Sequence, residues 1–103
     1  MANLVMGYKP THPGEVLKDE IEYRGLSQIN LARNMGMSYK ALNQILNEKR
    51  PLTETTAMLF EAALDVPADV LMRLQYKYNM RIAQKDKTFA KRLAQIRKMA
   101  AMF

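Results

Sequence analysis

Polar side chains between residues 39 and 47 lie at the spacing of one helix face. They are Tyr39, Lys40, Asn43, Gln44 and Asn47. Their groups match the hydrogen-bonding edges of DNA bases, because a lysine can donate to guanine acceptors and a side-chain amide can pair with adenine. A tyrosine can contact a thymine methyl group or a phosphate. The pattern predicts a helix that reads bases in the major groove, although polar faces of small helices often only contact solvent.

The residues around this face decide between the two interpretations. Residues 28–45 have the layout of two short helices that cross at a tight turn, which is typical of a helix-turn-helix. Ala32 is small where the helices must approach closely, and Gly36 lies where a left-handed backbone is favourable without a Cβ. Ser38 begins the second helix and joins the candidate DNA contacts. The inward positions of the pair are apolar: Leu31, Met35, Met37, Leu42 and Ile45.

The sequence pattern predicts an all-α protein that consists of three parts. Residues 1–11 lack sustained periodicity and predict a flexible N-terminal arm. Residues 12–84 predict a helix-turn-helix domain, and residues 85–103 predict a basic amphipathic helical extension. Residues that cap or end helices predict six of them. The first four run from His12 or Pro13 to Gly25, from Ser27 to Gly36, from Ser38 to Asn47 and from Thr53 to Asp65. The fifth begins at about Ala68, and the sixth begins after a cap at Thr88.

The same periodicity predicts which side chains form the core. His12 is expected to cap the first helix. Most of the nine methionines are expected to fill the core, Met58 among them. The fourth and fifth helices are expected to bury Leu59, Phe60, Ala63, Leu64, Leu71, Leu74, Tyr78 and Ile82.

The composition argues against an enzyme. The chain has no cysteine and one histidine, and no cluster of acids lies beside a nucleophile, so the usual groups for acid–base, covalent or metal catalysis are missing. We expect no catalytic residue, no cofactor and no metal site. No long apolar run indicates a signal peptide or a membrane span, so we expect a cytoplasmic protein without a membrane partner.

The net charge of +6 is concentrated in the C-terminal part of the chain. Residues 1–80 hold nine Lys/Arg and nine Asp/Glu, whereas residues 81–103 hold seven basic residues and one acid. Within the neutral part, acids precede cations along the chain. The acids are Glu15, Asp19, Glu20 and Glu22, and the cations are Arg24, Arg33, Lys40, Lys49 and Arg50. A protein with one acidic and one basic side orients itself on a polyanion such as DNA.

Several short sequence steps flank the predicted helix pair. The chain opens its first helix with His12-Pro13-Gly14-Glu15-Val16-Leu17, and further steps stand at Leu26 to Gln28, Leu31-Ala32 and Asn47 to Pro51. With these steps the chain resembles the Xre-like helix-turn-helix repressors, and within them the HigA-type antitoxins. The resemblance covers residues 12–80. The chain departs from the family at Asp65, where glycine is frequent, and residues 85–103 lie beyond what most members share.

The resemblance implies both a fold and a function. The fold is a five-helix domain like that of lambda repressor, in which Gln28, Lys49 and Arg50 grip the DNA backbone. The function is that of an antitoxin, which binds a RelE-like, mRNA-cleaving toxin and represses the operon encoding both proteins. We expect a homodimer on an inverted-repeat operator of double-stranded DNA, with half-sites about one helical turn apart.

Two other functions remain open. The chain could be a stand-alone repressor of the same family without a toxin partner. It could also be an adaptor that uses the helix-turn-helix only as a scaffold. The extension could pack on its own domain, pair across a dimer, or engage a partner protein or extra DNA phosphates. Its apolar positions favour the dimer or the partner protein: Phe89, Leu93, Ile96 and Phe103.

Overall fold

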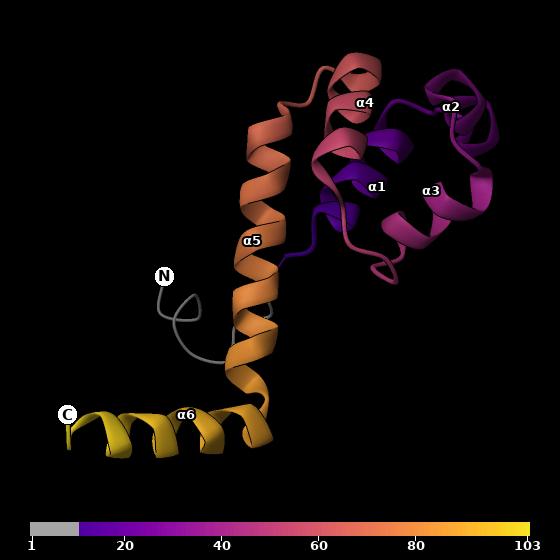
Figure 1. The fold of residues 1–103 in the computed structure, drawn as a ribbon. Helices are drawn as coiled ribbons and strands as arrows, with labels where there is room; N and C mark the ends of the chain where they lie inside the picture. Colours follow the sequence, from indigo (N-terminus) through magenta and orange to yellow (C-terminus); the bar gives the residue numbers. More distant parts are fainter. Residues whose placement is uncertain (1–10) are drawn as a thin grey trace.

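The computed structural model describes residues 11–103 and consists of α-helices (Figure 1). The helices are α1 (Pro13–Tyr23), α2 (Gln28–Met35), α3 (Tyr39–Leu46), α4 (Glu54–Leu64), α5 (Ala68–Lys85) and α6 (Lys87–Ala100). No strand occurs between residues 11 and 103, so the predicted all-α class is confirmed. The predicted arm lies, except for Thr11, outside the described residues. Among the helices of residues 11–103, none combines the length and the hydropathy that a membrane span requires.

One apolar core joins α1 to α5. Phe60 on α4 is its largest fully buried side chain. Every one of the first five helices contributes buried residues, and Leu52 joins them from the segment between α3 and α4. The full set is Leu17, Ile21, Leu31, Ala32, Met35, Leu42, Ile45, Leu46, Leu52, Ala57, Phe60, Leu64 and Leu71. The predicted inward face of α2 and α3 is confirmed, with Met37 partly buried against this cluster. The core therefore fixes the helix pair from behind.

Side-chain caps determine where the first four helices begin. His12, Ser27, Ser38 and Thr53 each accept a hydrogen bond from a backbone N–H in the first turn that follows. Such caps satisfy donors that the helix itself leaves free. Gly36 ends α2 in the left-handed conformation, with φ 69°. All five residues have the roles that the sequence predicts.

Two non-glycine residues in the described chain have positive φ. Glu48 has φ 62° in the turn after α3, and Asp65 has φ 58° at the end of α4. Aspartate tolerates this left-handed conformation better than most residues because its short polar side chain bonds locally. A glycine at this position would adopt the same conformation without strain.

The expected core on α4 is wrong at two positions. Met58 is 62% exposed and Leu59 is 40% exposed. The buried residues of this helix are Ala57, Phe60 and Leu64. A surface helix buries only one stripe of side chains. Leu59 precedes Phe60 by one residue and therefore points about 100° away from it, outside that stripe.

Helix α5 leaves the domain in its last turns. Leu71 and Gln75 are its buried residues, and the Gln75 side-chain oxygen accepts a hydrogen bond from the Leu52 N–H at 2.8 Å. Ile82 was expected inside and is 48% exposed, because the last turns of α5 pass beyond the other helices (Figure 1).

Helix α6 begins two residues earlier than expected. Asp86 is its N-cap and accepts a hydrogen bond from the Phe89 N–H at 3.1 Å. The predicted cap, Thr88, instead lies inside the helix. An aspartate carboxylate is a good cap and is also favoured by the positive end of the helix dipole. The division of the chain at residues 84 and 85 stays a prediction.

His12 is a buried cap, 1% exposed. Its Nδ1 accepts a hydrogen bond from the Gly14 N–H at 2.9 Å, and its ring meets the ring of Tyr78 edge-on, with centroids 4.8 Å apart. Burial lowers the pKa of His12 below its ordinary value of 6.5. The negative charges of Glu48 and Glu15 raise this pKa, but their effect is smaller than that of burial. The folded protein therefore favours the neutral imidazole.

This lowered pKa predicts loss of stability in acid. Above pH 6.5 neither state binds the proton, so the contribution of His12 to stability is complete. Below that pH the unfolded chain takes up the proton first, and the free energy of unfolding falls by up to about 1.4 kcal/mol per pH unit. Urea denaturation between pH 7.5 and pH 5.5 measures the slope. His12→Asn keeps a cap without a titrating ring, and an unchanged slope in that variant would contradict the assignment.

Candidate nucleic-acid interface

The turn between α2 and α3 is built as the sequence predicts. Gly36 supplies the left-handed residue, and the Met37 N–H then donates to the Ala32 carbonyl oxygen at 3.0 Å. Ala32 is 1% exposed, which reflects the close approach of the two helices. On α3, the buried side is Leu42, Ile45 and Leu46. The opposite edge of α3 is consequently left uncovered.

The predicted base-reading residues lie on that edge. Ser38, Tyr39, Lys40 and Asn47 are exposed, and Asn43 and Gln44 are half-buried. The Asn43 side-chain amide donates to the Tyr39 hydroxyl oxygen at 3.5 Å. This bond is long and weak, so both groups can exchange it for a base or a phosphate. The structure thus gathers these residues on one accessible side of a single helix.

Asn47 has a role that the sequence did not predict. It is the C-cap of α3, and its side-chain amide donates to the Asn43 carbonyl oxygen at 2.9 Å. The Lys18 Nζ donates to the Asn47 side-chain oxygen at 3.5 Å. Both ends of the Asn47 side chain therefore have partners within the protein.

The residues expected to grip the DNA backbone flank α3. Gln28 is the first residue of α2, where unpaired N–H groups favour a phosphate. Lys49 and Arg50 are exposed in the turn after α3. The ion pairs between residues 11 and 103 are Arg24–Glu20 and Arg73–Asp69. The cations Lys40, Lys49 and Arg50 therefore carry charges that no carboxylate of the described chain neutralises.

Gly14 is a structural residue that the sequence did not single out. It lies in the first turn of α1, is buried, and faces the backbone of Ile45 on α3. A Cβ at this position would clash with the Ile45 carbonyl group. The sequence did contain a signal for this role. Glycine is unfavourable inside a helix compared with alanine, so a glycine there indicates that another part of the backbone comes close. Gly14 lets α1 support α3 from behind.

The described chain offers no alternative metal centre. Among residues 11–103, no three His, Asp or Glu side chains form a group that could hold a metal ion. The candidate functional groups on the exposed edge of α3 and in the turn after it form hydrogen bonds or carry positive charge. Such an edge can bind a ligand by complementarity.

Comparison with known proteins identifies the family. A helix-turn-helix family model matches residues 17–71, which is more than half of the 103 residues. The chain belongs to the Xre-like helix-turn-helix family. Within this family it falls among the HigA-type antitoxins, as two solved relatives indicate. Members of this Xre-like group act by binding and are not enzymes.

The relatives come from three bacteria. Virulence-associated protein I of Dichelobacter nodosus is 32% identical over 77 residues, which cover 74% of this chain and 71% of that protein. The Pseudomonas aeruginosa antitoxin HigA, solved with the higBA promoter, is 32% identical with a TM-score of 0.70, over 84% of this chain and 90% of that chain. The third relative is a HigA-family antidote protein of an addiction module from Coxiella burnetii. It is 26% identical, with a TM-score of 0.74, and the match covers 85% of this chain and 95% of that protein.

Proposed function

We propose that the protein is the antitoxin of a type II toxin–antitoxin system and represses its own operon. In this proposal it binds an inverted-repeat operator as a homodimer and neutralises a RelE-like, mRNA-cleaving toxin in the cytoplasm. The observation that carries the proposal is the uncovered polar edge of α3 beside three unneutralised cations, in a chain that belongs to the HigA-type branch. A P. aeruginosa relative of that branch was solved with promoter DNA.

The proposed roles follow the position of each residue on the helix pair. Tyr39, Lys40, Asn43 and Gln44 would contact base edges, because the first turns of a recognition helix enter the major groove. The residues at its ends would hold the DNA backbone, and these are Gln28, Ser38, Asn47, Lys49 and Arg50. Residues 12–84 would form the DNA-binding domain, preceded by the arm 1–11 and followed by the extension 85–103.

Co-expression with the product of the adjacent small reading frame tests the antitoxin function. We expect that product alone to arrest growth, and we expect this chain to restore growth and to co-purify with it as a stable complex. The Lys40→Ala/Asn43→Ala variant serves as the control, because it removes proposed DNA contacts without touching the core. This variant should still restore growth when both proteins are expressed from an unrelated promoter.

Two outcomes would reject the antitoxin function. One is the absence of any complex between this chain and the adjacent product. The other is a complex that forms without restoring growth. If the chain still bound the DNA upstream of its reading frame, the protein would be a stand-alone repressor.

A further inference from the structure

Helix α6 is the least covered element of residues 11–103. None of its residues is buried, and its main contact is with α5, at the corner where the two helices meet (Figure 1). It has 14 residues, a length at which an isolated helix is marginally stable in water. A helix of this kind gains stability when a second surface covers its apolar side.

An apolar stripe runs along α6 to the end of the chain at alternating spacings of four and three residues. It consists of Phe89, Leu93, Ile96, Ala100 and Phe103. Arg92 and Arg97 flank the stripe on opposite sides, and Lys91 and Lys98 lie on the far side of the helix. A partner that covers the stripe would therefore also meet the two arginines.

The charge of α6 excludes several partners. The helix has five cations and no acid, namely Lys87, Lys91, Arg92, Arg97 and Lys98. Pairing α6 with another α6 would bring like charges together at the flanks of the stripe, which disfavours a coiled coil. DNA phosphates would neutralise the cations but would leave the apolar stripe in water. The stripe and its flanks together require a protein surface that is acidic and partly apolar.

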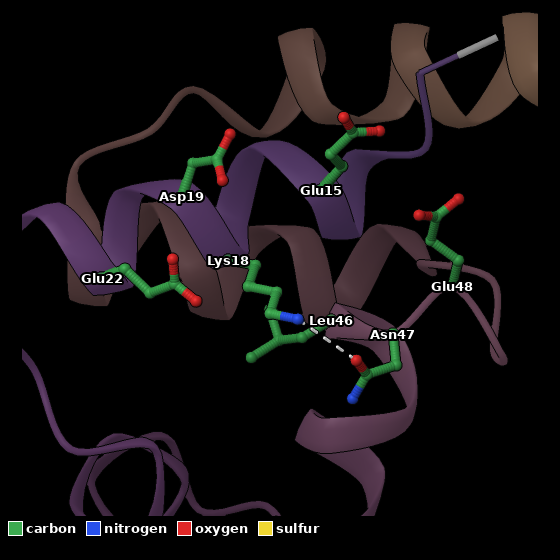
Figure 2. A pocket seen from close by; sticks show the side chains of 7 residues that line it. All are labelled: Glu15, Lys18, Asp19, Glu22, Leu46, Asn47 and Glu48. Atoms are coloured by element: carbon green, nitrogen blue, oxygen red, sulfur yellow. Dashed lines mark hydrogen bonds between the residues drawn. The ribbon is translucent and has the colours of Figure 1, made fainter. Parts of the chain in front are cut away.

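This chain carries such a surface on the exposed side of α1 (Figure 2). An open pocket of about 420 Å³ lies between α1 and the end of α3. We call it the acidic groove, and the carboxylates that line it are Glu15, Asp19, Glu22 and Glu48. None of them forms an ion pair within residues 11–103. Figure 2 shows the amine of Lys18 directed at Asn47 and not at a carboxylate.

The dimensions and apolar content of α1 suit α6. Val16 and Tyr23, on the same helix as the acids, are 37% and 89% exposed. Asp19 and Glu15 are separated by about 6 Å along α1, and Arg92 and Arg97 by about 7.5 Å along α6, at 1.5 Å per residue. Because Arg92 and Arg97 lie on opposite sides of the stripe, one of them can face Glu15 and Asp19 while the stripe meets Val16 and Tyr23 beside these acids.

We propose that α6 of one copy docks on the acidic groove of a second copy, and that the exchange is reciprocal. Within one copy the contact cannot form, because α6 extends from the far end of α5 and away from α1 (Figure 1). A reciprocal exchange satisfies two-fold symmetry, because each copy supplies one helix and one groove. The inference rests on the dimer of the proposed function, whereas the toxin-neutralisation test does not depend on it.

Charge reversal on each side of the contact tests the proposal. Sedimentation equilibrium of the full chain at 150 mM NaCl should show a dimer. We expect Arg92→Glu/Arg97→Glu to raise the dimer Kd at least tenfold, and Glu15→Arg/Asp19→Arg to do the same. Combining both double substitutions should restore at least part of the affinity. Lys91→Glu/Lys98→Glu is the matched control, because it makes the same charge change on the far side of α6 and should alter Kd less than threefold.

Cross-linking locates the contact independently of Kd. The chain contains no cysteine, so introduced thiols react only with each other. A mixture of Asp19→Cys and Arg97→Cys chains should form the mixed disulfide, and a mixture of Asp19→Cys and Lys98→Cys chains should not. Circular dichroism should give the same helix content for every variant.

Several results would overturn the docking proposal. They are a monomer at all concentrations, a control variant that weakens the dimer as much as Arg92→Glu/Arg97→Glu, and a combined variant without rescue. Cross-linking of Asp19→Cys to a co-expressed toxin but not to a second copy would assign the groove to the toxin. Sedimentation of the wild type, but not of Arg92→Glu/Arg97→Glu, with vesicles of phosphatidylcholine and phosphatidylserine would assign the helix to a membrane if no dimer formed.

Discussion

Gly14→Ala is expected to lower the free energy of unfolding by about 3 kcal/mol or more, although alanine is the better helix former by about 1 kcal/mol. The added Cβ would overlap the Ile45 carbonyl oxygen and lie 2.9 Å from the carbonyl carbon. Neither atom can rotate away, since both belong to the backbone of α3. Urea denaturation of the purified variant measures the loss.

Gly36→Ala is the matched control for Gly14→Ala. Its Cβ would meet nothing within 4 Å, so the cost comes from the positive φ alone. We expect a loss of about 1–2 kcal/mol. If Gly14→Ala were as stable as the wild type, the close approach of α1 to α3 would be refuted. A loss in Gly14→Ala no larger than that in Gly36→Ala would show that α1 and α3 move apart at little cost.

Lys40→Ala is expected to cost about 1–3 kcal/mol of discrimination at one base pair of the operator. Lys40 lies in the first turn of α3, is exposed, and has no carboxylate partner in the described chain. Lys49→Ala should instead weaken binding to every duplex alike. It should also reduce the slope of log affinity against log salt concentration by about one, because one phosphate contact is lost. Fluorescence anisotropy with single-base operator variants separates the two effects.

These two lysines serve as controls for each other, since each substitution removes one positive charge. Loss of affinity without any change of base preference in Lys40→Ala would demote Lys40 to a phosphate contact. Changed base preference in Lys49→Ala would place the turn after α3 in the groove. Either result would require a different docking of the helix pair.

The helix pair could be predicted from the sequence because local chemistry determines it. Ser27, Gly36 and Ser38 act on the backbone within one turn of their own position, so their residue types suffice. The inward residues of α2 and α3 follow from a short periodic pattern. The exposed edge of α3 then remains by elimination, and it carries the residues named from the sequence.

Features that depend on distant contacts could not be predicted. The clash at Gly14 requires the position of α3, which lies some thirty residues later in the chain. The exposure of Met58 and Leu59 depends on how wide a stripe of α4 the other helices cover. At the start of α6, Asp86 and Thr88 were both chemically suitable caps, and the end of α5 selects Asp86.

The central claim is that the polar edge of α3 reads a DNA sequence. Binding of the wild-type chain to the duplex upstream of its own reading frame, compared with a shuffled duplex of equal length and composition, tests this claim most directly. The account predicts binding at least a thousandfold tighter to the upstream duplex, in the lower part of the range for specific recognition, together with a steep loss of affinity as salt rises. Equal affinity for both duplexes at every salt concentration would contradict it.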